Sequence, residues 1–456
     1  MGVRSVAVRR ARLAARREAL GLTQEALAER LGVELSTVGR WERGAQLPQP
    51  PMRLRLAAVL GVSIDELGGL LRADGPRDAG PLEEDVRGDQ LNWLRTRQAP
   101  GVRGRELSEL AAWLYPADQR APGGHVLVGP GWLLDRPVEL DSVRLVFSDE
   151  VPTRPRPAPM DHVLPLAAHG KRYSSYARAV RDLVRPRLLE NRLSYRLIDV
   201  SAGEHLALTF GTTTFFEVFD VKQPVAHEFK AAWLASDRSI PAWDALPLRS
   251  QIGDPFDPTR LVLSPGISTL TIRKDLRGDH RFVLHERDGG KVADGGGLCH
   301  VMPAGEFQPS SVSPVDLRND FSLWRNIMRE YSEEFLGDPE HDGGASGPID
   351  YAAEEPFRSF GQARAQGSFR LWHYGLVTEP LELGAAQLTV AVVDGDVFDD
   401  LFAKLVQTND EGHIVGAGGR RDIPFTADAI DRLEPRLSAS ALTLLRLAWR
   451  DRGQLL

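Results

Sequence analysis

Three glutamates stand close together in residues 329–337, which read REYSEEFLG. Glu330, Glu333 and Glu334 are spaced i, i+3 and i+4, so a helix would place all three on one face. Carboxylate oxygens on one face can share a divalent cation such as Mg²⁺. The spacing leaves three interpretations open: a catalytic metal site, a disused one, or the solvated face of an amphipathic helix.

The surrounding segment, FSLWRNIMREYSEEFLG, carries large apolar side chains at helical spacing. At about 100° per residue they cluster on one side of a helix, and the three glutamates cluster on the other. Strand-like sequences precede and follow this segment, as in RLVLSPGISTLTIRK and FRLWHYGLVTEPLELGAAQLTVAVV. We therefore expect a helix that packs on a sheet and turns its carboxylates toward a cleft.

The composition is that of a globular protein with more than one domain. The chain has 456 residues, of which 42% are hydrophobic and 26% charged. About 150 residues per domain predicts two or three units. No apolar run reaches the roughly 18 residues that cross a bilayer, and no secretory signal is visible. Because Cys299 is the single cysteine, no internal disulfide is possible, and we expect a cytoplasmic, nucleoid-associated protein without a membrane partner.

Charge is distributed unevenly along the chain. Residues 1–60 hold eleven Arg and five Glu with no Lys or Asp, a formal charge of +6, so the remaining residues carry −13 of the total of −7. A basic segment on an acidic body is typical of a nucleic-acid contact surface. Arginine is abundant throughout the chain, however, so charge alone does not decide the function.

Residues 1–72 read as five short helices. Thr23 is a predicted N-cap of TQEALAERL, which stops at Gly32, and LSTVGRWERG follows after a short turn. Helix, short turn and helix together form the DNA-binding supersecondary motif. Eight apolar residues are expected to form one small core: Leu27, Leu31, Val38, Trp41, Leu56, Leu60, Ile64 and Leu67.

This order of helices resembles the helix-turn-helix domain of the XRE/Cro repressor family, through GLTQEALAERLGVELSTVGRWERG and LAAVLGVSIDEL. The resemblance implies a double-stranded DNA partner. It also implies that Gln24 binds phosphate and that Ser36, Thr37 and Arg40 face base edges. Arg43 is a further phosphate candidate. These roles agree with the chemistry, because Arg can bond guanine through two N–H groups while Gln and helix-end amides position phosphate.

Residues 72–90 are rich in Gly, Pro and acidic residues and predict a linker. A helical stretch, RELSELAAWLYPADQR, follows and completes a connector over 73–121. Residues 122–257 alternate strands, among them SVRLVF, SYRLIDV and HLALTFGTTTFFEVFDV, with one Arg-rich helix, so they predict a mixed α/β region. Within this region, Lys171 and Arg172 in HGKRYSSY stand next to a helix start and are candidates for binding an anionic ligand. Crowded polar residues at a helix cap are the structural alternative.

From residue 258 to 456 the chain resembles the Nudix family, whose box is G-x5-E-x7-R-E-U-x-E-E-x-G-U, with U a bulky aliphatic residue. Arg329, Glu330, Glu333 and Glu334 match its R-E and E-E positions, and Gly305 resembles its opening glycine. The resemblance implies a mixed-sheet sandwich in which the glutamates hold Mg²⁺, or Mn²⁺, on a substrate diphosphate. It makes Glu333 and Glu334 the catalytic candidates if the box is active, and Arg329 a ligand-binding candidate.

The box is degenerate. Gly305 and Arg329 are 24 positions apart where the box has 14, so about ten residues within QPSSVSPVDLRND look inserted. Phe321 stands where the upstream Glu belongs, and Leu336 where the later glycine belongs. Glu306 or Asp320 could supply the missing carboxylate. We therefore expect the fold to survive better than the hydrolytic activity.

Together these patterns predict a multidomain protein: an all-α, five-helix head and an α/β (α+β) body with a Nudix-like mixed-sheet sandwich. The predicted function is a transcription regulator whose body senses a nucleotide or another phosphorylated small molecule. Two alternatives stay open: an active Mg²⁺-dependent hydrolase of nucleoside diphosphate derivatives, and an oligomerising scaffold. A homodimer or higher homo-oligomer is expected, because one such head reads only half of a DNA site.

Overall fold

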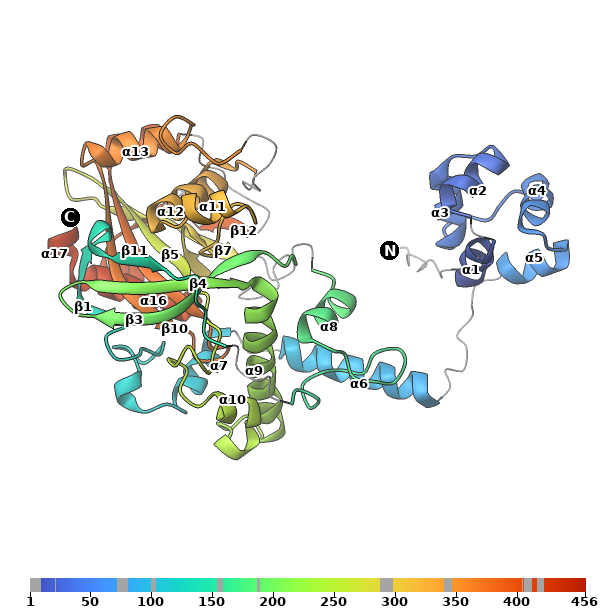
Figure 1. Ribbon diagram of the computed structural model, residues 1–456, viewed down its shortest axis with the longest axis horizontal. Helices are drawn as coiled ribbons and strands as arrows, with labels where there is room; N and C mark the ends of the chain where they lie inside the picture. Colours follow the sequence, from blue (N-terminus) through green and yellow to red (C-terminus); the bar gives the residue numbers. More distant parts are fainter. Residues whose placement is uncertain are drawn as a thin grey trace. The chain divides into compact units, whose positions relative to one another are not determined.

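Figure 1 shows the computed structural model of the protein, which divides into two compact units, 1–85 and 86–456. The residues that the structure describes are 10–20, 22–71, 81–99, 104–153, 159–186, 189–287, 298–339, 347–403, 405, 412–415 and 422–456.

Within the described residues 10–71 the head has five helices, which confirms the predicted all-α fold (Figure 1). They are α1 (Ala11–Ala19), α2 (Gln24–Leu31), α3 (Leu35–Glu42), α4 (Pro50–Leu60) and α5 (Ile64–Leu71). Thr23 caps α2, since its Oγ1 accepts a hydrogen bond of 3.0 Å from the Ala26 N–H. Gly32 ends α2 with φ 68°, a left-handed conformation that glycine adopts without steric cost. Local sequence thus sets both ends of this helix.

The core of the head contains seven of the eight predicted apolar residues. Ile64 is the exception: its side chain is 47% exposed. It is the first residue of α5, and its side chain lies in solvent while Leu67 and Leu71 on the same helix are buried. The prediction that Ile64 belongs to the core was therefore wrong, and the buried side of α5 begins one turn later, at Leu67.

The predicted linker is shorter than 72–90, because α6 (Pro81–Gln98) already covers its second half. Glu83 and Glu84 lie in the first turn, where acidic residues favour a helix. From Val86 onward α6 belongs to the second unit, where Trp93 is buried and its Nε1 donates to the Val163 carbonyl at 2.9 Å. Residues 72–80 lie outside the described part of the chain. The predicted second helix of the connector is present as α7 (Gly104–Ala112).

A central mixed sheet organises the second unit (Figure 1). Its strands, in spatial order, are β1 (Leu133–Glu139), β10 (Phe369–Thr378), β11 (Ala385–Asp394), β5 (Gly266–Lys274), β6 (Arg281–Phe282) and β13 (Ile423–Pro424), with β9 (Ala304–Gly305) also pairing β5. Strands β11 and β5 are parallel, and the other pairs are antiparallel. This confirms a mixed α/β body.

The predicted division at residue 257 does not coincide with a boundary between compact units. Strand β1 comes from the predicted middle region, yet its backbone pairs with β10. Backbone hydrogen bonds therefore join the two predicted regions into one sheet, and residues 86–456 form one unit.

Two smaller sheets flank the central one. The first orders β2 (Arg144–Phe147), β4 (Leu206–Thr214) and β3 (Leu193–Ala202), and the second orders β12 (Gly412–Val415), β7 (Leu284–Arg287) and β8 (Cys299–Val301). The predicted strand HLALTFGTTTFFEVFDV ends at Thr214, where α9 (Phe215–Ala235) begins. The predicted Arg-rich helix is the shorter α8 (Tyr176–Leu183).

Helices cover both faces of the central sheet. Ala391 and Val393 of β11 belong to a core shared with α12 (Leu323–Tyr331) and α13 (Phe357–Ala365). The alternating residues Leu388, Val390 and Val392 belong to a second core, shared with α16 (Ala439–Arg450). This alternation is expected of a strand buried on both sides. Among the described residues, no helix has the length and apolar character needed to span a membrane.

Candidate nucleic-acid interface and carboxylate helix

The third helix of the head presents the predicted base-reading residues on one exposed face. Ser36 and Arg40 are exposed and Thr37 is partly exposed, whereas Val38 and Trp41 are buried. Arg40 Nη2 lies 3.4 Å from Ser36 Oγ and 3.2 Å from Thr37 Oγ1. A guanidinium and two hydroxyls are therefore grouped where a DNA groove could meet them.

Gln24 is held in place by a buried ion pair that the sequence reasoning missed. Gln24 Nε2 donates to Glu42 Oε2 at 2.6 Å, and Glu42 Oε1 accepts from Arg17 Nε at 2.7 Å. Glu42 and Arg17 are only 3% and 6% exposed. An amide nitrogen carries two hydrogens, so Gln24 keeps one donor for a further acceptor. Helical periodicity in the sequence could have revealed this pair. Arg17 lies four residues after Leu13 and Glu42 four residues after Val38, so both charged residues fall on the apolar faces of their helices.

Arg43 follows α3 directly and is exposed. Its guanidinium folds back along the helix, because a Cβ atom at Gly39 would lie 2.9 Å from Arg43 Nη1. The small residue at position 39 thus leaves space for the charged group beside the helix. All five predicted DNA-contacting residues belong to α2, α3 or the residue after α3.

Glu330 lies on α12, and Glu333 and Glu334 lie in the turn after it, but the three carboxylates do not form the single cleft-facing side that was predicted. Glu334 is 6% exposed, and its Oε1 accepts a hydrogen bond of 3.3 Å from the Ala304 N–H of β9. Glu330 packs against Gly305, the second residue of β9, since a Cβ atom at Gly305 would overlap the Glu330 carboxylate. Glu333 is partly exposed. Two of the three glutamates therefore pack against β9.

A change of helix type explains this difference. The α-helix stops at Tyr331, and residues Ser332–Leu336 form a turn of π-helix that ends at Gly337. A π-turn has more residues per turn than an α-helix, so the angle of 100° per residue does not hold between Glu330 and Glu334. Tyr331 remains on the apolar side, where its hydroxyl bonds Thr271 Oγ1 at 2.7 Å.

The predicted Mg²⁺ site does not fit this arrangement. Among the described residues, no group of three or more His, Cys, Asp or Glu side chains is placed to hold a metal ion. Glu334 is turned toward a backbone N–H and Glu330 toward a glycine, both on β9. Mn²⁺ needs the same converging oxygen ligands.

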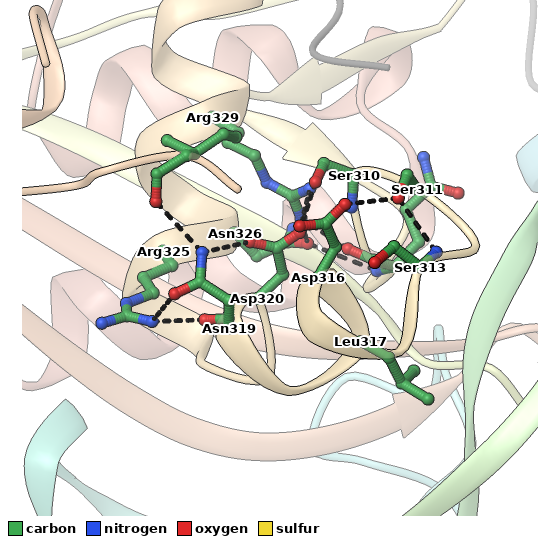
Figure 2. Close-up of polar contacts among 12 residues, drawn as sticks. Ser310, Ser311, Ser313, Asp316, Leu317, Asn319, Asp320, Arg325, Asn326 and Arg329 are labelled. Atoms are coloured by element: carbon green, nitrogen blue, oxygen red, sulfur yellow. Dashed lines mark hydrogen bonds and ion pairs between the residues drawn. The ribbon is translucent and has the colours of Figure 1, made fainter. Parts of the chain in front are cut away.

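The inserted residues before α12 form a buried polar network (Figure 2). Asp320 has no exposed surface, and its Oδ2 accepts from Ser310 N–H at 2.7 Å and from Ser310 Oγ at 2.6 Å. Its Oδ1 accepts from the Tyr351 hydroxyl at 2.7 Å. Burial raises the pKa of Tyr351, so this hydroxyl stays protonated and donates. Asp320 is thus committed within the fold and does not replace the missing box carboxylate.

Arg329 belongs to the same network. It is 5% exposed, its Nη1 lies 3.6 Å from Asp320 Oδ2, and its Nη2 donates to Asn326 Oδ1 at 2.9 Å and to the Gln308 carbonyl (Figure 2). The guanidinium is surrounded by acceptors from the inserted segment and from its own helix. This placement favours a structural role for Arg329 over the predicted role in ligand binding.

Lys171 and Arg172 lie in the second unit, and no described contact joins them to α12. Arg172 Nη1 donates to Asp89 Oδ1 of α6 at 2.7 Å and to the Leu164 carbonyl at 2.9 Å. Arg172 therefore holds α6 against this loop. This agrees with the interpretation of HGKRYSSY as polar residues that stabilise the fold at a helix start. Lys171 is exposed, and its role in ligand binding stays a prediction.

Comparisons with known proteins concern mainly the head. A helix-turn-helix family model matches residues 13–67. The "Cryptic phage CTXphi transcriptional repressor RstR" of Vibrio cholerae is 36% identical over 63 residues, which are 14% of this chain and 56% of the repressor. The "Uncharacterized HTH-type transcriptional regulator YazB" of Bacillus subtilis is 43% identical over 56 residues, 12% of this chain and 81% of YazB. This chain thus spans little more than half the length of RstR.

Among solved structures, a NUDIX hydrolase from Alicyclobacillus acidocaldarius is similar at 14% identity. The match covers 41% of this chain and 96% of the hydrolase, with a TM-score of 0.21.

Proposed function

We propose, since the chain belongs to the XRE-type helix-turn-helix transcriptional regulators, that it binds double-stranded DNA through α3 and regulates transcription. The observation that carries this proposal is the exposed group of Ser36, Thr37 and Arg40 on one face of that helix. In such domains the second helix of the motif enters the major groove, where side chains read base edges.

The residues divide into two roles. Arg40 carries five N–H donors in a planar fork that matches guanine O6 and N7, and the hydroxyls of Ser36 and Thr37 can donate or accept. Two residues contact phosphates: Gln24, which begins α2 and is held by Glu42, and Arg43, which follows α3. Base contacts give sequence discrimination, and phosphate contacts give register and affinity.

The body is proposed to sense an effector, a nucleotide or another phosphorylated small molecule. Support comes from the residues that match the Nudix box, Arg329 to Glu334, which lie on α12 and the turn after it. Because Arg329 and Glu334 are already engaged in contacts within the fold, we favour a sensor over a hydrolase and do not assign the ligand contacts to these two side chains. A Mg²⁺-dependent hydrolase is the alternative, and release of phosphate or nucleoside monophosphate from a nucleotide panel would favour it. A body that only oligomerises would bind none of these molecules.

The DNA proposal is tested by selecting duplexes from a random pool with the full-length protein and measuring affinity for the selected site. Arg40→Ala should cost about 1–3 kcal/mol on that site and relax its sequence preference. Arg43→Ala should weaken selected and random DNA alike. Arg55→Ala removes the same charge from an exposed position on α4 and is the matched control. Equal losses on both DNAs for Arg40→Ala would remove its role in reading bases.

The effector proposal is tested by thermal stabilisation with a nucleotide panel and by titrating the operator with and without the stabilising compound. Effector and DNA must change each other's affinity by the same factor, and we expect at least about fivefold. Identical dissociation constants with and without the compound would refute a sensor, even if both molecules bind.

A further inference from the structure

Helix α8 of the second unit carries arginines along its exposed side. Arg178 and Arg181 lie on the helix and Arg185 two residues after its end, and all three are exposed. At about 100° per residue they fall within roughly 60° of one another, and the buried residues of α8 lie on the other side, toward α9. We call Arg178, Arg181 and Arg185 the arginine stripe. It includes neither the base-reading residues of the head nor the residues that match the Nudix box.

The arginine stripe is not neutralised by carboxylates. Other exposed arginines of the body form ion pairs: Arg260 with Asp257, Arg358 with Glu355 and Arg432 with Asp428. Between described residues, no ion pair engages a guanidinium of the stripe. Arg181 instead lies over the Phe216 ring, 5.1 Å from its centroid, and a guanidinium stacked in this way keeps its N–H groups directed outward along its edge. These donors are therefore open to an anion from solvent.

The fold itself explains only part of the arginine stripe. Arg185 Nε donates to the Asp182 carbonyl at 3.1 Å, and arginine near the end of a helix offsets the negative pole of the helix dipole. Arg178 lies in the first turn, where that dipole disfavours a cation. Like charges three or four residues apart, as in this stripe, also repel one another along a helix. A bound anion would remove this repulsion.

The segment around the stripe is positive in an acidic body. Residues 169–185 hold five Lys and Arg and one Asp, a formal charge of +4, whereas the residues after 60 carry −13 in total. The one acidic residue of α8 is Asp182, whose carboxylate lies beside the Tyr173 hydroxyl: burial, together with this neighbouring charge, raises the pKa of Tyr173. The arginine stripe is thus the part of this segment that attracts anions.

The shape and length of the arginine stripe fit a polyanion better than a small molecule. Small-molecule sites are concave, whereas these three side chains stand in solvent on one side of a helix. At about 1.5 Å per residue, Arg178 to Arg185 spans roughly 10 Å, over which one strand of duplex DNA carries about three phosphates. The head of the same chain is proposed to bind duplex DNA, and a second contact on one chain acts at a raised effective concentration.

We propose that the arginine stripe is a second DNA contact, through which the body binds backbone phosphates without reading sequence. The inference rests on the proposed function, because the head brings the duplex to the chain. Arg40 then determines which site is bound, and the stripe adds affinity and salt dependence on every sequence.

Salt-dependent titration of the full-length protein tests the proposal. The selected site is placed at the centre of a long random duplex, and affinity is measured between about 50 and 200 mM salt. The triple variant Arg178→Gln, Arg181→Gln and Arg185→Gln should lower the slope of log affinity against log salt by about 2–3, since each phosphate contact contributes roughly 0.9. Replacing the same three residues by Lys should keep the wild-type slope, because a phosphate contact needs the charge.

The matched control removes the same formal charge from exposed arginines that have carboxylate partners: Arg260→Gln, Arg358→Gln and Arg432→Gln. It should leave the slope unchanged. Circular dichroism checks the folding of each variant. If the triple stripe variant is disturbed, Arg178→Gln with Arg185→Gln decides, because this double variant keeps the contact between Arg181 and Phe216, and its slope should fall by about 2.

An unchanged slope in the Gln variant, an equal fall in the control, or a Lys variant as weak as the Gln variant overturns the proposal. A Gln variant that keeps its slope but loses thermal stabilisation by ADP also overturns it and assigns the stripe to the effector. Sequence preference separates these failures from failure of the proposed function. A wild type that prefers the selected site but shows no stripe effect overturns only the second contact. A wild type that binds all duplexes alike, with the expected fall in slope, supports the stripe and refutes base reading by the head, and no binding to any duplex at the lowest salt refutes both.

Discussion

Glu42 is a charged residue of the head whose loss should be costly. It is 3% exposed and accepts hydrogen bonds from Arg17 Nε at 2.7 Å, Arg17 Nη2 at 3.3 Å and Gln24 Nε2 at 2.6 Å. The hydrogen bond to Glu42 raises the pKa of Arg17. Glu42→Ala would leave this guanidinium charged, buried and without its carboxylate.

The expected magnitude follows from that burial. Removing one partner of a buried ion pair costs about 3–5 kcal/mol, a large share of the roughly 5–15 kcal/mol that holds a typical domain together. Removing both charges, with Arg17→Met and Glu42→Leu, leaves no unpaired charge. The double variant should therefore recover most of the loss, because apolar replacement of a buried pair is often neutral or stabilising.

Urea unfolding of residues 1–85, followed by circular dichroism, measures these changes, since this unit has its own core. Glu29→Ala removes an exposed carboxylate from α2 and is the control, with an expected change within about 0.5 kcal/mol. A loss below about 1 kcal/mol for Glu42→Ala, or a double variant no more stable than Glu42→Ala, would refute the account of the buried pair.

Three further predictions concern the body. Gly305→Ala should destabilise it by up to about 1 kcal/mol, because the new methyl group displaces the Glu330 carboxylate, which is the end of a flexible side chain. In thermal unfolding, the double variant Gly305→Ala with Glu330→Ala should recover the stability that Gly305→Ala loses. In the same assay, Mg²⁺ should not raise the melting temperature of the wild type. Burial lowers the pKa of His373 to about 4, below the value near 6.5 of an unfolded chain. The unfolded state then binds the proton more readily, so the free energy of unfolding should fall by up to about 3 kcal/mol as the pH drops from 6.5 to 4. In unfolding experiments between pH 7 and 5, His373→Gln should make the free energy of unfolding depend less on pH.

The head could be predicted from the sequence because its determinants are local. Thr23 and Gly32 set the ends of α2 within a few residues, and Val38 and Trp41 are buried at the expected helical spacing. The helices of the head and most of its core residues could be predicted from this local pattern. Ile64 did not, because periodicity alone does not tell whether the first residue of a helix reaches the core.

The carboxylate helix could be predicted as an element, but its side-chain directions could not. They depend on the π-turn after Tyr331 and on the position of Gly305, 25 residues before Glu330. Likewise, the polar composition of 81–90 concealed α6, which is held in the body by Trp93 through a contact 70 residues away. Periodicity within one segment carries no information about such partners.

The edge strand β1 has a consequence for the order of events during synthesis. Leu133 pairs with Gly375, which leaves the ribosome 242 residues later. At roughly 5–20 residues per second, β1 waits on the order of 10–50 s for its partner. The helices of the head make their contacts within residues 10–71 and need not wait. A nascent chain therefore carries its head helices while its central sheet is unfinished, and the unit that can fold before the sheet is the one with the helix-turn-helix motif.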